Sequence, residues 1–216
     1  MSEMANDGWK RRWREGNIGF HQEDVNAQLR QFWPELVPDE SAAVLVPLCG
    51  KSTDMVWLVR RGHRVVGVEL SELAARAFFA ENGLRCSERT VDQFLVLESD
   101  GIEIWVGDFF ALKSEMLPSL TAWYDRAAIV ALEPAVRSAY AEQIARLLQR
   151  EAVGFMLTFD YPAAEREGPP FSVSFADVEA VFGHAFATVQ MDCLDLTEGN
   201  RWELSRVWKP VVSLRR

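Results

Sequence analysis

Short apolar runs alternate with amphipathic stretches along most of this chain. Ala43–Pro47, Arg64–Leu70 and Val153–Phe159 are apolar runs of strand length. Thr53–Arg61 and Pro134–Leu148, in the intervals between runs, carry apolar side chains at helical spacing. Strands that alternate with helices predict an α/β fold with a mainly parallel sheet.

Polar turn sequences set the bounds of the other predicted elements. The sequence Ser99-Asp100-Gly101 predicts a hairpin turn, and Ser71 is a candidate N-cap. The other predicted strands are Phe94–Leu97, Ile102–Val106, Ala122–Asp125, Phe186–Leu194 and Leu204–Trp208, and the other predicted helices are Leu73–Glu81 and Ser174–Val181. We expect the last two strands to close the sheet as an antiparallel pair.

Length, charge and cysteine content narrow the class of protein. The 216 residues suffice for one domain with a buried core, and no linker divides them. A net charge of −9 without a basic block argues against nucleic acid and anionic membranes as partners. No apolar stretch reaches the roughly 18 residues of a membrane span, and the polar start lacks a secretory h-region. We expect a cytoplasmic protein that acts on a small molecule.

Cysteine and histidine positions predict neither disulfides nor a metal site. The three cysteines lie far apart in the sequence, as do the three histidines, and none are paired at zinc spacing. We expect Cys49 to be a buried packing residue and His63 to lie in a surface turn. His21 is the only histidine that we consider as a base.

The turn after the first predicted strand raises the question of what it binds. Gly50-Lys51-Ser52 matches the end of a phosphate-binding loop, but such a loop needs a glycine where this chain has Leu45. The dinucleotide fingerprint needs three glycines, whereas this turn contains only Gly50. Neither phosphate motif therefore fits.

Glu69 matches one part of the nucleoside-binding pattern, the acid that binds the ribose. It ends the second predicted strand 19 residues after Gly50, close to the roughly 20 residues expected for a ribose-binding acid. A nucleoside site without a phosphate cradle favours S-adenosyl-L-methionine over NAD as the cofactor. The alternative is that Glu69 is a helix-entry acid favoured by the helix dipole.

Five stretches carry a resemblance to a known family. They are "VLVPLCGKSTDMVWLVRRGHRVVGVELSE", "WKRRWREGNIGFHQEDVN", "WVGDFFAL", "WYDRAAIVAL" and "REGPPFSV". Together they resemble the thiopurine S-methyltransferase family, in particular its bacterial branch, from Trp9 to Trp208. The resemblance implies a class I, Rossmann-like methyltransferase fold. This is a three-layer α/β sandwich whose mostly parallel, seven-stranded-type sheet ends in a C-terminal antiparallel hairpin.

The same resemblance implies the domain organisation and the cofactor. Residues 1–216 would form a single methyltransferase domain, and residues 1–35 an N-terminal helical segment that covers the cofactor. The cofactor would be S-adenosyl-L-methionine, and the protein would be a monomer. The residues that the resemblance places at the site are Trp13, Phe20, Leu48, Glu69, Asp108, Phe109 and Arg126.

Each implied role has a simpler alternative. Trp13 would pack on the methionine part of the cofactor, above the turn that contains Leu48, but it also has helical spacing from Trp9. Asp108 and Phe109 would bracket the adenine, although aspartate is common in ordinary turns.

Phe20 would touch both cofactor and substrate, and Glu69 would bind the ribose hydroxyls. Arg126 would position the acceptor or the cofactor, or instead pair with Asp125. The loop Gly168–Phe171 would form a wall of the acceptor site or a plain crossover.

The resemblance implies S-methylation of aromatic and heterocyclic thiols such as thiopurines. The bacterial branch also suggests methylation of selenium and tellurium species, as in tellurite detoxification. Two alternatives stay open at this point. One is an NAD-dependent oxidoreductase on a Rossmann-like scaffold, and the other is a non-catalytic cofactor-binding module.

Overall fold

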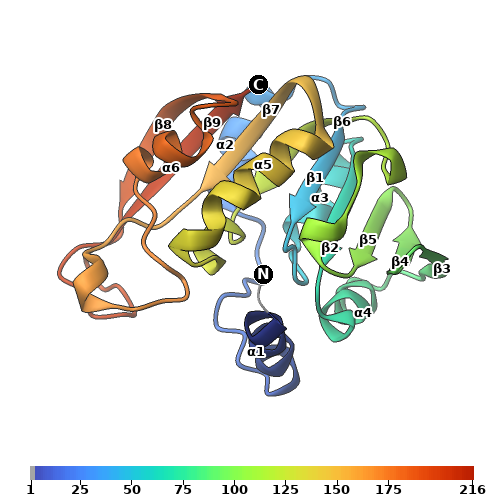
Figure 1. The fold of residues 1–216 in the computed structure, drawn as a ribbon, viewed down its shortest axis with the longest axis horizontal. Helices are drawn as coiled ribbons and strands as arrows, with labels where there is room; N and C mark the ends of the chain where they lie inside the picture. Colours follow the sequence, from blue (N-terminus) through green and yellow to red (C-terminus); the bar gives the residue numbers. More distant parts are fainter. Residues whose placement is uncertain (1–2) are drawn as a thin grey trace. The chain divides into compact units, whose positions relative to one another are not determined.

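A computed structural model describes residues 3–216, with side chains from residue 7 onward. Contacts between residues divide the chain into two compact units, one up to Ala122 and one from Trp123 to Arg216. We call them unit 1 and unit 2 and describe each by itself (Figure 1). Residues 1 and 2, which belong to the predicted domain and covering segment, lie outside the described residues.

Unit 1 contains the first five strands. Its strands are β1 (Ala43–Pro47), β2 (Arg64–Glu69), β3 (Ser87–Val91), β4 (Phe94–Ser99) and β5 (Ile102–Val106). Its helices are α1 (Glu3–Arg14), α2 (Ala27–Leu36), α3 (Asp54–Arg60) and α4 (Glu72–Glu81), with the 3₁₀ turns η1 (Phe109–Ala111) and η2 (Ser114–Met116). Strand β6 (Leu120–Asp125) runs across the boundary of the two units.

The sheet of unit 1 brings the ends of β1, β2 and β5 to one edge. Its strand order is β3-β4-β5-β2-β1. β2 lies between β1 and β5 and is parallel to both, with Pro47 opposite Val68 and Glu69 opposite Val106. The predicted hairpin is confirmed as β4–β5, and the exposed edge strand β3 was not predicted, because Ser87–Val91 lacks an apolar alternation. The carboxyl ends of three parallel strands therefore lie side by side.

Side-chain caps start the helices around this edge. Ser71 caps α4 as predicted, since its hydroxyl accepts a hydrogen bond from Ala74 N. Asn26 caps α2 through the N–H groups of Gln28 and Leu29, and its own N–H donates to the buried carboxylate of Asp54 at 2.8 Å. The loop before α2 is thereby fixed to the start of α3. None of the helices in the described part of the chain is long and apolar enough to span a membrane.

His63 is buried, so the prediction of a surface turn was wrong. Only 2% of His63 is exposed, and its Nε2 accepts a 2.9 Å hydrogen bond from the indole N–H of Trp33. Burial lowers the pKa of His63 below its ordinary value, because the charged ring would lose hydration. The glycine before it indicated a turn correctly, but the partner 30 residues away gave no local signal.

Unit 2 is built around the C-terminal strands. They are β7 (Leu148–Leu157), β8 (Ala187–Asp195) and β9 (Trp208–Arg215), with helices α5 (Arg137–Leu147) and α6 (Phe175–Phe182) and the 3₁₀ turns η3 (Ile129–Ala131), η4 (Pro134–Val136) and η5 (Ala163–Glu165). β9 is antiparallel to both β7 and β8, and α6 begins with a capping box between Ser174 and Asp177. The predicted closing hairpin is thus confirmed (Figure 1).

The second strand of that hairpin was predicted too early in the sequence. Leu204–Trp208 was predicted as the strand, whereas β9 runs over Trp208–Arg215. Leu204 and Val207 are buried instead in a small cluster with Tyr161. These apolar residues fill a loop core rather than a sheet face, and local periodicity does not distinguish the two.

Candidate cofactor site

The turn after β1 is held in a specific shape that does not wrap a phosphate. Leu48 (φ 48°) and Gly50 (φ 55°) are both left-handed, which is uncommon for a leucine. The side chain of Lys51 forms an ion pair outside the turn, with its Nζ at 2.6 and 2.8 Å from the two carboxylate oxygens of Glu81. The lysine that a phosphate loop would use therefore belongs to an ion pair with α4.

Glu69 connects this turn to the end of β2. Its carboxylate accepts hydrogen bonds from Gly50 N at 2.8 Å and from Ser71 N at 2.7 Å. Glu69 is 6% exposed, and burial raises its pKa, while hydrogen bonds from backbone N–H groups act in the opposite direction. An ionised carboxylate has about four acceptor positions. The unused positions can accept the two hydroxyl groups of a ribose.

Trp13 covers the same turn. A Cβ atom placed on Gly50 would lie 3.0 Å from Cζ2 of Trp13, so the indole packs directly on the glycine. Phe20 stands perpendicular to Trp13 at 5.5 Å and to Trp9 at 5.8 Å, measured between ring centroids. The structure therefore brings Trp13, which lies on the turn, together with Phe20, and Trp9 contacts Phe20 as well.

Asp108 and Phe109 lie just beyond β5, next to the end of β2. Gly107 N donates to the backbone oxygen of Glu69 at 2.9 Å, which places the loop after β5 beside the acid. Asp108 caps η1 by accepting Phe110 N at 3.0 Å, so the ordinary turn role is present. Phe109 is buried, with 4% exposed. One carboxylate oxygen of Asp108 thus carries the cap, and the cap leaves the other oxygen for a ligand.

Cys49 is a packing residue, as predicted. Its side chain is buried, and a Cβ atom on Gly67 would lie 2.8 Å from its Sγ. Burial, followed by the nearby charge of Glu69, raises the pKa of the Cys49 thiol well above its ordinary value. A protonated thiol is a poor nucleophile, which agrees with a packing role for Cys49.

The Asp-Arg turn belongs to unit 2. Asp125 is fully buried and accepts hydrogen bonds from Tyr140 Oη at 2.7 Å and from Ala128 N at 2.9 Å. Burial raises the pKa of Asp125 to about 6, against the opposing effect of these hydrogen bonds. Arg126 follows this anchored residue and is half-buried. Its contact with the cofactor stays a prediction.

Two features of the site were not predicted from the sequence. The Gly50 N–H that donates to Glu69 is a backbone group and leaves no side-chain signal. Tyr140 lies on the apolar face of a helix pattern, where a tyrosine looks like any other core aromatic. A buried acid at the end of a strand, such as Asp125, is the one signal that could have led to it, since a buried charge needs hydrogen-bond partners.

Solved structures show the same fold. An N-methyltransferase, NodS from Bradyrhizobium japonicum, in complex with S-adenosylhomocysteine matches with a TM-score of 0.67 at 9% identity, covering 98% of each chain. The 1,6-didemethyltoxoflavin-N1-methyltransferase of Burkholderia thailandensis matches with a TM-score of 0.66 at 16% identity, covering 98% of this chain and 86% of the other. The fold is therefore that of the class I S-adenosylmethionine-dependent methyltransferases.

Sequence comparisons define the family within that class. The model of the thiopurine S-methyltransferase family matches residues 4–216. The thiopurine S-methyltransferase of Pseudomonas syringae pv. tomato is 50% identical over 170 residues, covering 79% of this chain and 77% of the relative. That of Pseudomonas fluorescens is 42% identical over 200 residues, covering 93% and 91%. The chain belongs to the thiopurine S-methyltransferase family.

Membership of this family settles the cofactor class. The chain is a methyltransferase, its cofactor is S-adenosyl-L-methionine, and the alternatives of an oxidoreductase and of a non-catalytic module are set aside. The residues fit this cofactor, because the first turn offers a buried acid with unused acceptor positions and an aromatic cover but no phosphate cradle.

Proposed function

We propose that this enzyme transfers the methyl group of S-adenosyl-L-methionine to the sulfur of small aromatic and heterocyclic thiols such as thiopurines. The observation that carries the proposal is the bond from Gly50 N to Glu69, with Trp13 packed on that glycine. It builds a nucleoside site beside an aromatic wall, and a π-face stabilises a cation such as a sulfonium.

The proposal assigns the cofactor contacts of unit 1 to five residues. Glu69 binds the ribose hydroxyls, and Trp13 packs on the methionine part above Leu48. Asp108 accepts the adenine amino group on the oxygen that its cap leaves over, while Phe109 packs on the ring. Every one of these residues lies at or over the edge where β1, β2 and β5 end.

Two further residues belong to the acceptor side of the proposal. Phe20 contacts Trp13 and extends the aromatic surface from the cofactor toward the substrate. Arg126 orients the acceptor or the carboxylate of the cofactor, from a turn that Asp125 and Tyr140 hold in place.

In the proposed reaction, the main role of the protein is to orient the acceptor toward the methyl group. Bound S-adenosyl-L-methionine supplies a methyl group on a good leaving group. The enzyme aligns a nucleophile with that methyl group, and alignment alone can provide about 7–11 kcal/mol of the barrier. A thiolate is already a strong nucleophile, so the residues need to orient it rather than to deprotonate it. Selenium and tellurium anions are softer nucleophiles still, and we include them as further acceptors.

The cellular setting completes the proposal. We place the enzyme in the cytoplasm as a monomer that acts on free small molecules.

Calorimetric titration with S-adenosylhomocysteine tests the site. We expect tight binding to the wild type and a loss of about tenfold, roughly 1.4 kcal/mol, in Glu69→Ala. The matched control is Glu81→Ala. Glu81 is an exposed acid that pairs with Lys51 of the same turn. The affinity of that variant should stay within about twofold of the wild type.

Two results would contradict the proposal at different levels. Unchanged binding in Glu69→Ala would place the ribose contact elsewhere. Wild-type enzyme that binds S-adenosylhomocysteine but forms no methylated product from 6-mercaptopurine or thiophenol would contradict the thiol acceptor class.

A further inference from the structure

Asp125 is a buried acid at the end of β6 whose charge the proposed reaction does not use. It is 0% exposed, although aspartate is rarely buried completely in folded proteins. Burying an ionised group is costly, and apolar replacements of such groups are often neutral or stabilising. Asp125 also lies at the carboxyl end of a strand, where ligands of α/β proteins bind. Its charge therefore needs an explanation besides stability.

The carboxylate of Asp125 closes the turn that contains Arg126. Its Oδ1 accepts hydrogen bonds from Ala128 N at 2.9 Å and from Ile129 N at 3.3 Å, and its Oδ2 shares the second of these N–H groups at 3.3 Å. The two donors lie three and four residues further along the chain, so only Arg126 and Ala127 stand between the acid and its partners. The carboxylate thereby sets the direction in which Arg126 leaves the strand.

Tyr140 holds the same carboxylate from helix α5. Its hydroxyl donates to Oδ2 of Asp125 at 2.7 Å, and its buried ring stands edge-on to Phe182, with 6.2 Å between ring centroids. Burial, followed by the charge of Asp125, raises the pKa of Tyr140 well above its ordinary value, so the hydroxyl keeps the proton that it donates. The carboxylate is thus fixed between a core helix and the turn.

The far end of the turn is bound to the loop that follows β7. Phe171 N donates to Val130 O at 2.6 Å. The guanidinium of Arg137 donates to Leu132 O and to Ser172 O, each at 3.2 Å. These bonds use backbone groups and a permanent charge, so they do not change with pH near neutrality. The carboxylate is the part of this arrangement that can change its charge.

Ionisation of Asp125 decides how strongly the turn is closed. Hydrogen bonds to a charged acceptor are roughly twice as strong as those to a neutral one. The N–H groups of Ala128 and Ile129 can only donate, so a proton on the acid weakens both of their bonds. Burial raises the pKa of Asp125 to about 6, against the opposing effect of Tyr140 and of these N–H groups. The change therefore falls close to neutral pH.

The neighbouring elements of unit 2 define the charges around Asp125. The ionisable side chains of α5 are Arg137, Tyr140, Glu142 and Arg146. Tyr140 faces the acid, Arg137 donates to backbone carbonyl groups, and the other two are exposed and pair with each other. In β7, which follows β6 in the sheet, residues 152–157 are not ionisable, and η3 contributes backbone N–H groups. Arg126 is the charged side chain of the turn itself.

We propose that Asp125 is a positioning residue for methyl transfer, whose ionised carboxylate closes the turn and fixes the direction of Arg126. Asp125 is not the base of the reaction, because it is buried and both of its oxygens accept hydrogen bonds from the protein. The enzyme therefore loses activity when this acid is protonated, even with an acceptor that is already ionised. This inference rests on the proposed function, because it explains how the Arg126 of that proposal is oriented.

The pH profile of kcat tests the proposal with an acceptor that does not titrate. Pentafluorothiophenol is a strongly acidic thiol and a weak nucleophile, so it is ionised near neutral pH and methyl transfer limits kcat. With cofactor and acceptor at saturation, kcat of the wild type should fall about tenfold from pH 8 to pH 5, with a midpoint near the pKa of Asp125, about 6. Tyr140→Phe removes a bond to the ionised form, so its midpoint should rise by about one pH unit. A role in packing alone would not move the midpoint.

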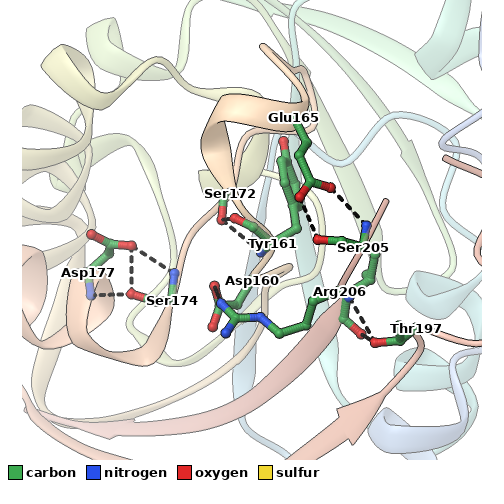
Figure 2. Close-up of polar contacts among 10 residues, drawn as sticks. Asp160, Tyr161, Glu165, Ser172, Ser174, Asp177, Thr197, Ser205 and Arg206 are labelled. Carbon is green, nitrogen blue, oxygen red and sulfur yellow. Dashed lines mark hydrogen bonds and ion pairs between the residues drawn. The ribbon is translucent and has the colours of Figure 1, made fainter. Parts of the chain in front are cut away.

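Two substitutions identify the groups that produce this pH dependence. Asp125→Asn keeps an acceptor oxygen but cannot ionise, so kcat should be about tenfold below the wild type at pH 8 and independent of pH. Arg126→Ala should also remove the pH dependence, because Asp125 acts through that side chain. The matched control is Asp177→Asn. Asp177 is an exposed acid that accepts hydrogen bonds from the N–H and the hydroxyl of Ser174 (Figure 2), and this variant should match the wild type at each pH.

A spectroscopic titration detects the link without turnover. In enzyme labelled with [15N]arginine, the Nε signal of Arg126, assigned with Arg126→Lys, should shift with the same midpoint as kcat. That midpoint should rise in Tyr140→Phe, and the shift should vanish in Asp125→Asn. Thermal unfolding with S-adenosylhomocysteine verifies that each variant is folded. If Asp125→Asn does not fold, Tyr140→Phe and the Arg126 signal still decide the question.

Four results would overturn the inference. They are a wild-type kcat that stays constant from pH 5 to pH 8, a midpoint that Tyr140→Phe leaves unchanged, a pH dependence that persists in Arg126→Ala, and an Arg126 signal that does not titrate. If the wild type methylates no aromatic thiol, the proposed acceptor class fails, and the titration of the Arg126 signal still decides whether Asp125 controls that side chain.

Discussion

The two units hold their loops in place by different means. In unit 1, Glu69 is fixed by backbone N–H groups of two neighbouring strand-to-helix turns, 19 and 2 residues away. In unit 2, Glu165 reaches Ser205, which is 40 residues away, and Arg166 rests on the indole of Trp202. The first arrangement follows from a parallel sheet itself, whereas the second depends on which loops happen to meet. The contacts of Glu69 are thus part of the fold, whereas those of Glu165 are added to it.

The largest expected effect is on the free energy of unfolding, when one strand glycine of each unit is replaced by alanine. Gly154 of β7 lies where a Cβ atom would be 1.8 Å from Nε1 of the buried Trp123. Trp123 packs on Phe182 at 5.4 Å and cannot yield. Gly154→Ala should therefore lower the free energy of unfolding by about 3 kcal/mol or more, and Gly67→Ala, which meets the smaller Cys49 side chain, by about 1–2 kcal/mol.

Urea unfolding of both variants measures this difference. Gly19→Ala is the control, because a Cβ atom there would have no neighbour within 4 Å. We expect that control to stay within about 0.5 kcal/mol of the wild type. A larger loss in Gly67→Ala than in Gly154→Ala would contradict the packing argument.

The sequence predicts unit 1 better than unit 2, because the contacts of unit 1 follow from neighbouring strands and turns whereas those of unit 2 join distant loops. β1, the β4–β5 hairpin and the cap of α4 by Ser71 were predicted closely, because each has a local signal. Glu69 could be singled out because its distance from the first turn is set by one helix and one strand. The predicted fold class is also confirmed, since the alternation of strands and helices can be recognised from local patterns.

Long-range contacts account for what was missed. Leu204 and Val207 have the alternation of a strand, yet they are buried against Tyr161 in a loop core. Trp202 gave no signal at all, because its neighbours Phe159 and Arg166 are more than 30 residues away along the chain. His63 was misplaced because its partner, Trp33, lies in another element.

A smaller effect tests the anchor of the Arg126 turn. Tyr140→Phe removes the hydrogen bond to Asp125 and should lower the free energy of unfolding by about 1–3 kcal/mol at pH 8. The pKa of Asp125 is raised to about 6 in the fold, from 3.8, so the folded protein binds this proton more readily than the unfolded chain. Stability linked to Asp125 therefore falls as pH rises from about 4 to about 6.

The pH dependence distinguishes this anchor from ordinary packing. The hydroxyl of Tyr140 stabilises the ionised carboxylate, so the loss in Tyr140→Phe should be smaller at pH 5, where the folded protein holds Asp125 mostly protonated. Tyr161→Phe is the control, since its hydroxyl donates to the uncharged Pro170 carbonyl. Its loss should be the same at pH 5 and pH 8. Equal losses at both pH values in Tyr140→Phe would exclude the proposed link to Asp125.

The smallest effect concerns a contact in unit 2 that joins residues 158–173 to residues 196–208, two segments that we call the paired loops. Glu165 is exposed, so Glu165→Gln should leave the unfolding midpoint unchanged, because solvent screens the interaction. Local opening should still increase, since glutamine keeps only one of the two side-chain oxygens that accept hydrogen bonds from Ser205 in Figure 2. We expect amide hydrogen exchange in residues 203–207 to accelerate about threefold or more. Glu142→Gln, an exposed acid of α5 that pairs with Arg146, should leave these amides unchanged.

A double-mutant cycle decides whether Glu165 and Ser205 act as one contact. Ser205→Ala alone should accelerate the same amides, and the double variant should add little to either single change, because the two side chains share one interaction. Additive acceleration would mean that they act independently and that other contacts set the arrangement of the paired loops. In unit 1, by contrast, Glu69 is held by backbone N–H groups of Gly50 and Ser71, which a side-chain substitution at an exposed position does not remove.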